Sequence, residues 1–140
     1  MLRPPTVRQA AQRLPQPRVT PESFPPQLRR LCTAAPFERL LHRGRDMLDV
    51  VRNVRGDVRD VHDLVAYPEN DAHVAALLAE CRRRHIAVVP FGGGSSVVGG
   101  VEPPPGVQAY AGCIAMDTAK MDRILEVDAS SQCARVQGGI

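Results

Sequence analysis

Apolar positions along the chain change their spacing near residue 60. Between residues 28 and 60 they recur every three or four positions, which is the spacing of one helix face, and Gly44 and Gly56 separate the runs. The spacing predicts a short helical segment over residues 28–60. Its apolar faces hold, in turn, Leu28, Leu31 and Cys32; Phe37, Leu40 and Leu41; and Met47, Leu48, Val51 and Val54.

The next pattern predicts a strand, a helix and a second strand. Residues 64–67 form a short apolar run that ends at Pro68, and residues 86–90 form another. Between them the apolar residues are spaced i, i+3, i+4, i+7 and Asn70 can cap the start, so we expect a helix over about residues 71–84. Short connections between these elements are typical of a βαβ unit whose two strands are adjacent and parallel.

Three further short apolar runs predict strands over residues 113–116, 124–127 and 133–136, where a second α/β subdomain begins. Residues 1–27 are rich in proline and arginine and have no apolar period, so we expect a flexible leader there. The predicted fold class is α/β (α+β), with the chain divided into residues 1–27, 28–60 and 61–140.

Composition and charge argue against several classes of function. The 140-residue chain has a formal net charge of only +3, spread without a basic block, which argues against nucleic-acid binding. No apolar run approaches the roughly 18 residues that a membrane span needs. The arginines of the leader resemble those of a mitochondrial transit peptide, but its prolines would break the amphipathic helix that such a peptide forms.

Cysteine spacing predicts neither a disulfide framework nor a zinc site, because the four cysteines lie far apart. We therefore expect free thiols and a cytoplasmic protein. We expect all four histidines to be solvated or to cap helices: His42, His62, His73 and His85. The carboxylates near the later strands are expected at turns and edges: Asp117, Asp122, Glu126 and Asp128. No catalytic residue and no metal ligand is nominated.

The strongest chemical signal is the stretch VVPFGGGSSVVGG at residues 88–100. Glycine permits positive φ and the close approach of a ligand to the backbone, and consecutive amides in such a turn can form an anion-binding nest. The stretch therefore predicts a phosphate or pyrophosphate cradle, with a plain surface loop as the alternative. Its candidate cofactor-binding residues are Pro90, Phe91, Gly92, Gly93, Gly94, Ser95, Ser96 and Val97.

Two common phosphate loops do not fit this stretch. The P-loop of nucleotide hydrolases requires Lys-Ser/Thr after its last glycine, where this chain has Gly100-Val101. The dinucleotide-binding pattern G-x-G-x-x-G would have Val97 at its third glycine. It must also open a helix, which the three prolines at residues 103–105 prevent.

With its flanks, the stretch resembles the pyrophosphate loop of the vanillyl-alcohol-oxidase (PCMH-type) FAD-binding family. In that family a strand ending in Pro leads into a Gly-Gly-Gly-Thr-Ser turn. DLVAYPENDAHVAALLAECRRRHIAVVPFGGG, at residues 63–94, is similar to the family's first βαβ unit. The segments at residues 42–68 and 115–140 resemble the alkyldihydroxyacetonephosphate synthase branch and its bacterial FAD-oxidase relatives. The likeness covers residues 28–140.

This resemblance implies FAD held non-covalently, because Ser95 stands where relatives with a covalent link carry His. It implies an enzyme that exchanges the acyl chain of an acylated dihydroxyacetone phosphate for a fatty alcohol, or one that oxidises a 2-hydroxy acid. The family's substrate-binding and catalytic residues lie beyond residue 140. We therefore expect the N-terminal half of such a domain, inactive without the missing C-terminal half. A truncated flavoprotein with no enzymatic role is the alternative.

Overall fold

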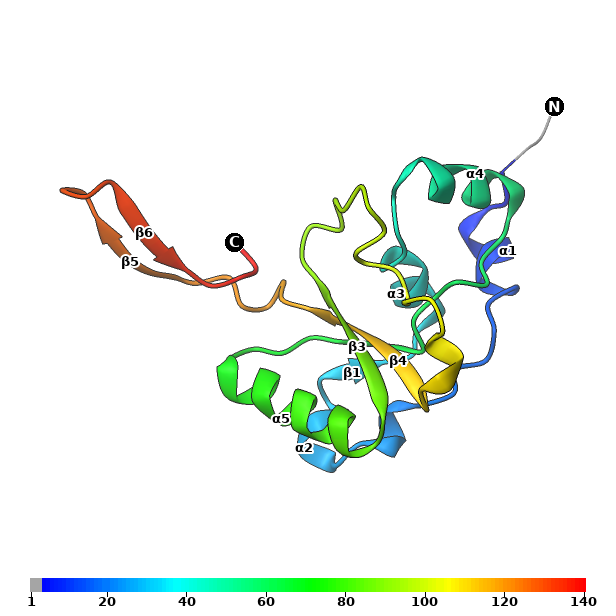
Figure 1. Cartoon of the computed structure of the whole chain (residues 1–140), viewed down its shortest axis with the longest axis horizontal. Coiled ribbons are helices and arrows are strands. Elements are labelled where there is room, and N and C mark those ends of the chain that lie inside the picture. Colours follow the sequence, from blue (N-terminus) through cyan, green and yellow to red (C-terminus); the bar gives the residue numbers. More distant parts are fainter. Residues whose placement is uncertain (1–3) are drawn as a thin grey trace.

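The structure is a computed structural model that describes residues 4–140, and it is built around a four-stranded mixed sheet (Figure 1). The strands are β1 (Cys32–Thr33), β2 (Leu64–Ala66), β3 (Ile86–Phe91) and β4 (Gly112–Asp117), in the order β1-β2-β4-β3. β1 runs antiparallel to β2, whereas β2, β4 and β3 are parallel. The carboxyl ends of these three strands therefore meet at one edge of the sheet, where α/β proteins bind ligands.

The predicted strand–helix–strand unit is present, and its two strands are parallel. Its helix, α5 (Asp71–Arg83), begins after Asn70, whose side chain accepts a hydrogen bond from His73 N at 2.9 Å. The prediction that the two strands are adjacent is wrong, because β4 lies between β2 and β3 and pairs with both. All of β4 is buried, which is the environment of a central parallel strand.

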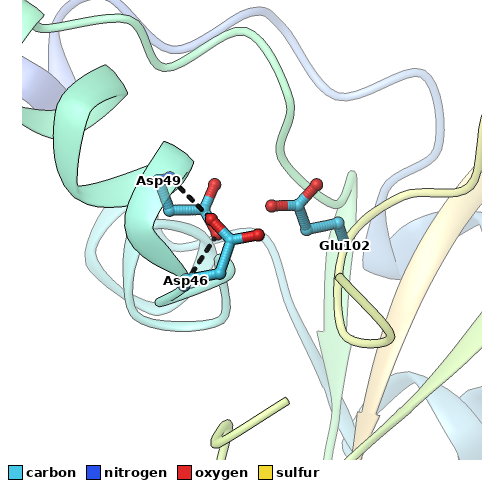
Figure 2. Close-up of side chains that lie close together, drawn as sticks. All are labelled: Asp46, Asp49 and Glu102. Carbon is cyan, nitrogen blue, oxygen red and sulfur yellow. Dashed lines mark hydrogen bonds between the residues drawn. The ribbon is translucent and has the colours of Figure 1, made fainter. Parts of the chain in front are cut away.

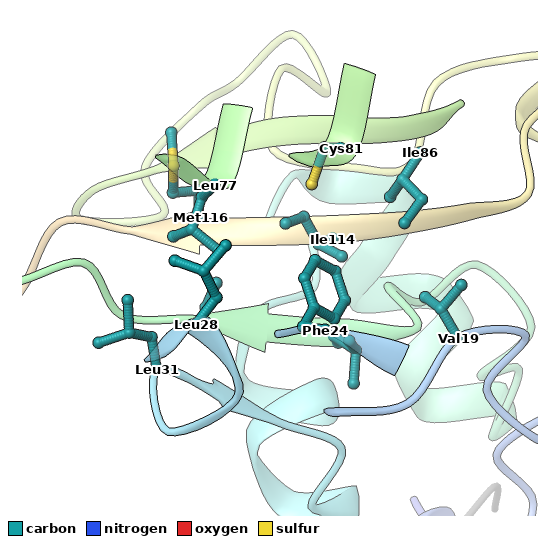
Figure 3. Packing of buried hydrophobic residues seen from close by; sticks show 11 residues of the cluster. Val19, Phe24, Leu28, Leu31, Leu77, Cys81, Ile86, Ile114 and Met116 are labelled. Atoms are coloured by element: carbon teal, nitrogen blue, oxygen red, sulfur yellow. The ribbon is translucent and has the colours of Figure 1, made fainter. Parts of the chain in front are cut away.

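One face of the sheet carries the main hydrophobic core (Figure 3). Alternate side chains of β2, β3 and β4 point to this face, and α5 covers them with Leu77 and Cys81. The rest of the cover comes from residues 19–31, which include the 3₁₀ helix η1 (Pro21–Ser23) and α2 (Pro26–Arg29). The buried apolar side chains of this segment are Val19, Phe24, Leu28 and Leu31.

The expectation of a flexible leader over residues 1–27 is therefore wrong for its later part and for the helix α1 (Val7–Ala11), while residues 1–3 lie outside those that the structure describes. Val19 and Phe24 are 6% and 2% exposed. The Asp63 carboxylate accepts hydrogen bonds from Arg18 N at 2.8 Å and from Arg18 Nη2 at 2.9 Å. The sequence did not predict this packing, because the segment is mostly extended and only isolated side chains hold it to the core. Such side chains have no regular apolar spacing.

The predicted helical segment over residues 28–60 is interrupted. It contains α3 (Pro36–Leu41) and α4 (Met47–Arg55), and α1 (Val7–Ala11) packs against α3. Cys32, which we expected on a helix face, pairs with Ala66 as part of β1. The strand arises here because the main chain meets the free edge of β2 and completes its hydrogen bonds.

Helix α4 turns its polar side toward the protein. Asp49 is 2% exposed, and Asn53 Oδ1 accepts a hydrogen bond from Arg43 Nη1 at 2.5 Å. The apolar side chains of α4 are exposed instead: Met47, Leu48, Val50, Val51 and Val54. The apolar spacing thus predicts the helix correctly and does not report which of its faces is buried.

A two-stranded antiparallel hairpin projects from the body of the protein (Figure 1). It consists of β5 (Ile124–Asp128) and β6 (Cys133–Val136), and both strands are exposed along their whole length. Together with β4, which follows the 3₁₀ turn η2 (Val107–Ala109), the hairpin confirms the three later strands. Among the helices of residues 4–140, none has the length and hydropathy to cross a membrane.

Candidate functional site

The glycine-rich loop leaves β3 at residue 92 and reaches residue 100 at the edge where the parallel strands end. Gly94 has φ of +67°, and an added Cβ there would lie 2.7 Å from Phe91 Cζ, so this position requires glycine. Gly92 and Gly93 face open space instead. An added Cβ would have nothing within 4 Å at Gly92 and only Ser95 Oγ, at 4.0 Å, at Gly93. A ligand can therefore approach the backbone at these two glycines.

Most backbone amides of this loop have no acceptor among the residues that the structure describes. Within residues 4–140, none of the N–H groups from Gly92 to Gly99 donates a hydrogen bond. Exposed N–H groups in succession are the donors from which an anion-binding nest is made. The loop therefore has the hydrogen-bonding capacity that a phosphate group requires.

The eight candidate residues of the loop differ in what they can contribute. Phe91, at the end of β3, is 5% exposed and lies beneath the loop, and Pro90 precedes it in the strand. Ser95 is exposed, whereas Ser96 Oγ accepts a hydrogen bond from Gly100 N at 2.9 Å and closes the loop. Val97 is 82% exposed. The exposed part of the loop backbone nearest β3 is thus at Gly92, Gly93 and Ser95, whereas Gly94 is buried.

A pocket of about 180 Å³ opens beside the loop. It is lined by the loop and by two segments distant in the sequence: Gly92, Gly93, Asp117, Thr118, Ala119, Gly138, Gly139 and Ile140. Gly139 packs against the carbonyl oxygen of Thr118 so closely that a side chain would not fit. The sequence pattern indicated none of the residues outside the loop, although the consecutive glycines at 138 and 139 were a usable signal.

Behind this pocket, His42 and Asp117 form a buried pair. His42 Nε2 lies 2.7 Å from Asp117 Oδ2, and the side chains are 1% and 10% exposed. His42 Nδ1 lies 2.8 Å from the carbonyl oxygen of Glu38, so His42 does cap α3, which is one of the two roles we expected. Its burial and its bond to Asp117 were not predicted, and the expectation that Asp117 is only a turn or edge residue is wrong.

His62, just before β2, is neither solvated nor a helix cap, so the expectation for this histidine is wrong. It is 0% exposed, and neither ring nitrogen has a hydrogen-bond partner within residues 4–140. Burial lowers the pKa of His62 to about 4, which keeps the ring neutral near pH 7.

Three carboxylates gather where the far end of the loop meets α4 (Figure 2). Asp46 and Asp49 cap α4 reciprocally, since each accepts a hydrogen bond from the backbone N–H of the other. Glu102 faces them from the loop side, and Arg52 Nη1 lies 3.3 Å from Asp49 and 3.5 Å from Glu102. Burial and the neighbouring Asp49 raise the pKa of Glu102 to about 7. The cluster ties the end of the loop to α4 through Arg52, which lies within reach of both carboxylates.

Comparison with known proteins identifies relatives in sequence and in fold. The model of the FAD binding domain family matches residues 62–140. Alkyldihydroxyacetonephosphate synthase of Trypanosoma brucei brucei is 32% identical over 141 residues, which cover 96% of this chain and 23% of that protein. The mitochondrial D-lactate dehydrogenase (cytochrome) of Kluyveromyces lactis is 34% identical over 80 residues, or 56% of this chain and 13% of that protein.

A solved structure of alkyldihydroxyacetonephosphate synthase has the same fold, with a TM-score of 0.74 and 24% identity over 96% of this chain and 26% of that one. The chain therefore spans about a quarter of the length of the synthases it matches. The family match includes the glycine-rich loop, the pocket and the hairpin. These findings confirm the resemblance seen in the sequence: the chain belongs to the FAD-binding domain family, and its cofactor is FAD.

Proposed function

We propose that the glycine-rich loop binds the pyrophosphate of FAD through its backbone amides. The observation that carries this proposal is the run of N–H groups from Gly92 to Gly99, which no acceptor within residues 4–140 uses. The open space over Gly92 and Gly93 leaves room for phosphate oxygens. When bound, FAD supplies the redox chemistry of the flavin, while the protein supplies binding and orientation.

We further propose that FAD is held non-covalently. Residues 92–100 contain only glycine, serine and valine, so the loop offers neither the imidazole nor the thiol that a covalent flavin link would use. The exposed Ser95 hydroxyl can donate a hydrogen bond to a phosphate oxygen instead. Each such bond contributes roughly 0.5–1.5 kcal/mol net, while ordering a long cofactor costs several kcal/mol. We therefore expect this chain to bind FAD with micromolar or weaker affinity.

For the whole protein we propose a flavin-dependent enzyme of the alkyldihydroxyacetonephosphate synthase type. The synthase from Trypanosoma brucei brucei aligns with 96% of this chain, whereas the D-lactate dehydrogenase aligns with 56%. A 2-hydroxy-acid dehydrogenase is the second candidate, because that relative is similar at 34% identity. On either view the remainder of the protein would enclose the flavin and bind the lipid-like or 2-hydroxy-acid substrate. The four free thiols support a cytoplasmic location.

A titration of the nitrogen-15-labelled chain tests the cradle. In proton–nitrogen correlation spectra, FAD should shift the amide signals of residues 92–99, whereas riboflavin, which has the flavin ring without phosphates, should leave them in place. ATP should bind negligibly, because residues 88–101 contain no lysine to reach its terminal phosphates. After acid precipitation of the protein, all of the flavin should stay in solution. Equal shifts with riboflavin, or shifts confined to the hairpin, would refute a pyrophosphate cradle.

A further inference from the structure

We propose that His42 is a positioning residue for the cofactor site. It holds the two sides of the pocket in place, namely the glycine-rich loop and the turn that follows β4. Its predicted effect on FAD rests on the function proposed above. The contacts that support it lie within the protein itself. They run from His42 to Asp117 on one side and to Phe91 on the other.

Asp117 links His42 to the turn that follows β4. Asp117 Oδ2 lies 2.7 Å from His42 Nε2, and Asp117 Oδ1 accepts a hydrogen bond from Ala119 N at 2.8 Å. Asp117 and Ala119 both line the pocket. His42 therefore fixes the carboxylate that gives this turn its shape.

Phe91 links His42 to the glycine-rich loop. The centroids of the two rings are 4.5 Å apart, with 51° between their planes. The tip of the Phe91 ring lies against Gly94, and the Phe91 carbonyl oxygen accepts a hydrogen bond from Thr118 N at 3.1 Å. A displaced His42 ring would therefore disturb the loop and the turn together.

The His42 ring is held in one orientation. Both ring nitrogens face acceptors, the Glu38 carbonyl oxygen at 2.8 Å and the Asp117 carboxylate at 2.7 Å. The Tyr67 ring packs edge-on against it with 5.7 Å between centroids, and the Tyr67 hydroxyl donates to Glu38 Oε2 at 2.5 Å. Removing the imidazole would leave a buried carboxylate oxygen without a donor, which is a costly state.

Substitutions at His42 separate positioning from folding. The amide nitrogen of Gln reaches about the place of Nε2, so His42→Gln keeps a donor to Asp117, whereas His42→Asn is too short to do so. We expect the affinity for FAD to change less than about 3-fold in His42→Gln and to fall at least about 10-fold in His42→Asn and His42→Leu. His62→Leu is the matched control, because the His62 ring is equally buried and neither of its nitrogens has a hydrogen-bond partner within residues 4–140. Its affinity for FAD should be unchanged.

The amide signals of residues 92–94 and 118–119 in FAD-free protein give a second readout that does not depend on the cofactor. They should move in His42→Asn and stay near their wild-type positions in His42→Gln and His62→Leu. If the wild type binds no FAD but the signals move in His42→Asn, the role of His42 is supported while the proposed function fails. A folded His42→Asn variant with unmoved signals and wild-type affinity would overturn the role. The Asn and Gln variants decide the question even where His42→Leu does not fold.

Discussion

Replacing Glu102 with glutamine should change how the free energy of unfolding depends on pH. The Glu102 side chain is 21% exposed, and burial and Asp49 raise its pKa from 4.5 to about 7. The folded protein therefore binds this proton more tightly than the unfolded chain. The stability contributed by Glu102 is full below pH 4.5 and is lost as the pH rises to about 7. The shift corresponds to about 3 kcal/mol, which solvent screening at this partly exposed group reduces to about 1–2 kcal/mol.

His62 acts in the opposite direction over the same pH range. Burial lowers its pKa from 6.5 to about 4, so the unfolded chain takes up a proton that the folded protein does not. The stability contributed by neutral His62 is full above pH 6.5 and is lost as the pH falls to about 4. This group corresponds to about 3 kcal/mol. In the wild type the two dependences have opposite signs and partly cancel.

Urea unfolding followed by far-ultraviolet circular dichroism measures both effects, and suits a chain without tryptophan. Between about pH 4.5 and 6.5, the free energy of unfolding of Glu102→Gln should rise by about 2–3 kcal/mol, because the His62 dependence alone remains. In His62→Leu it should fall by about 1–2 kcal/mol, because the Glu102 dependence alone remains. The wild type should change less than either variant. Identical pH profiles for Glu102→Gln and the wild type would refute the raised pKa of Glu102.

Three further substitutions and one chemical reaction test other parts of the structure. Gly93→Val should leave the fold intact and reduce the affinity for FAD at least about 10-fold. Gly94→Ala should lower the free energy of unfolding by about 1–2 kcal/mol, because Gly94 has a positive φ. Correlation spectra with and without FAD separate the loss of binding from the loss of stability. Asp63→Ala should lower the free energy of unfolding by about 1–3 kcal/mol in urea, since it leaves the buried Cys113 N without its acceptor and the partly exposed Arg18 without its partner. A disulfide reagent should modify the exposed Cys133 at once and reach the buried Cys113, whose pKa burial raises to about 12, only on unfolding; fast labelling of both thiols would contradict the packing of β4.

Most helices and strands could be predicted because each leaves a local pattern in the sequence. Helix α5 has both an apolar period and an N-cap at Asn70, and β3 has a run of β-branched residues. Which face of a helix is buried leaves no such local pattern. The apolar spacing of α4 is helical, yet Asp49 and not Met47 is buried, because Arg52 of the same helix pairs with Asp49 and with Glu102, which comes from a distant segment.

The glycine-rich loop could be predicted because the glycines that a phosphate cradle would require are consecutive in the sequence. The need for glycine at Gly94 is visible in the structure as a positive φ and a ring beneath it. The pair of His42 and Asp117 could not be predicted in this way, since its members are 75 residues apart and a single histidine has no spacing to interpret. Composition alone makes such a histidine look solvated or helix-capping, and only the second of these roles is present.

The order of the strands explains why this pair was not visible in the sequence. If β2 and β3 were neighbours, as the local pattern predicts, β4 would lie outside them and its end would not lie between the loop and Tyr67. In the structure β4 lies between them, and its register sets Asp117 opposite Phe91. The end of β4 thereby comes under the loop, where His42 from α3 can reach it. The pocket at this edge of the sheet therefore depends on a non-local strand pairing. The loop after β3 supplies the free amides on one side, and β4, inserted between β2 and β3, supplies Asp117 and the turn on the other side.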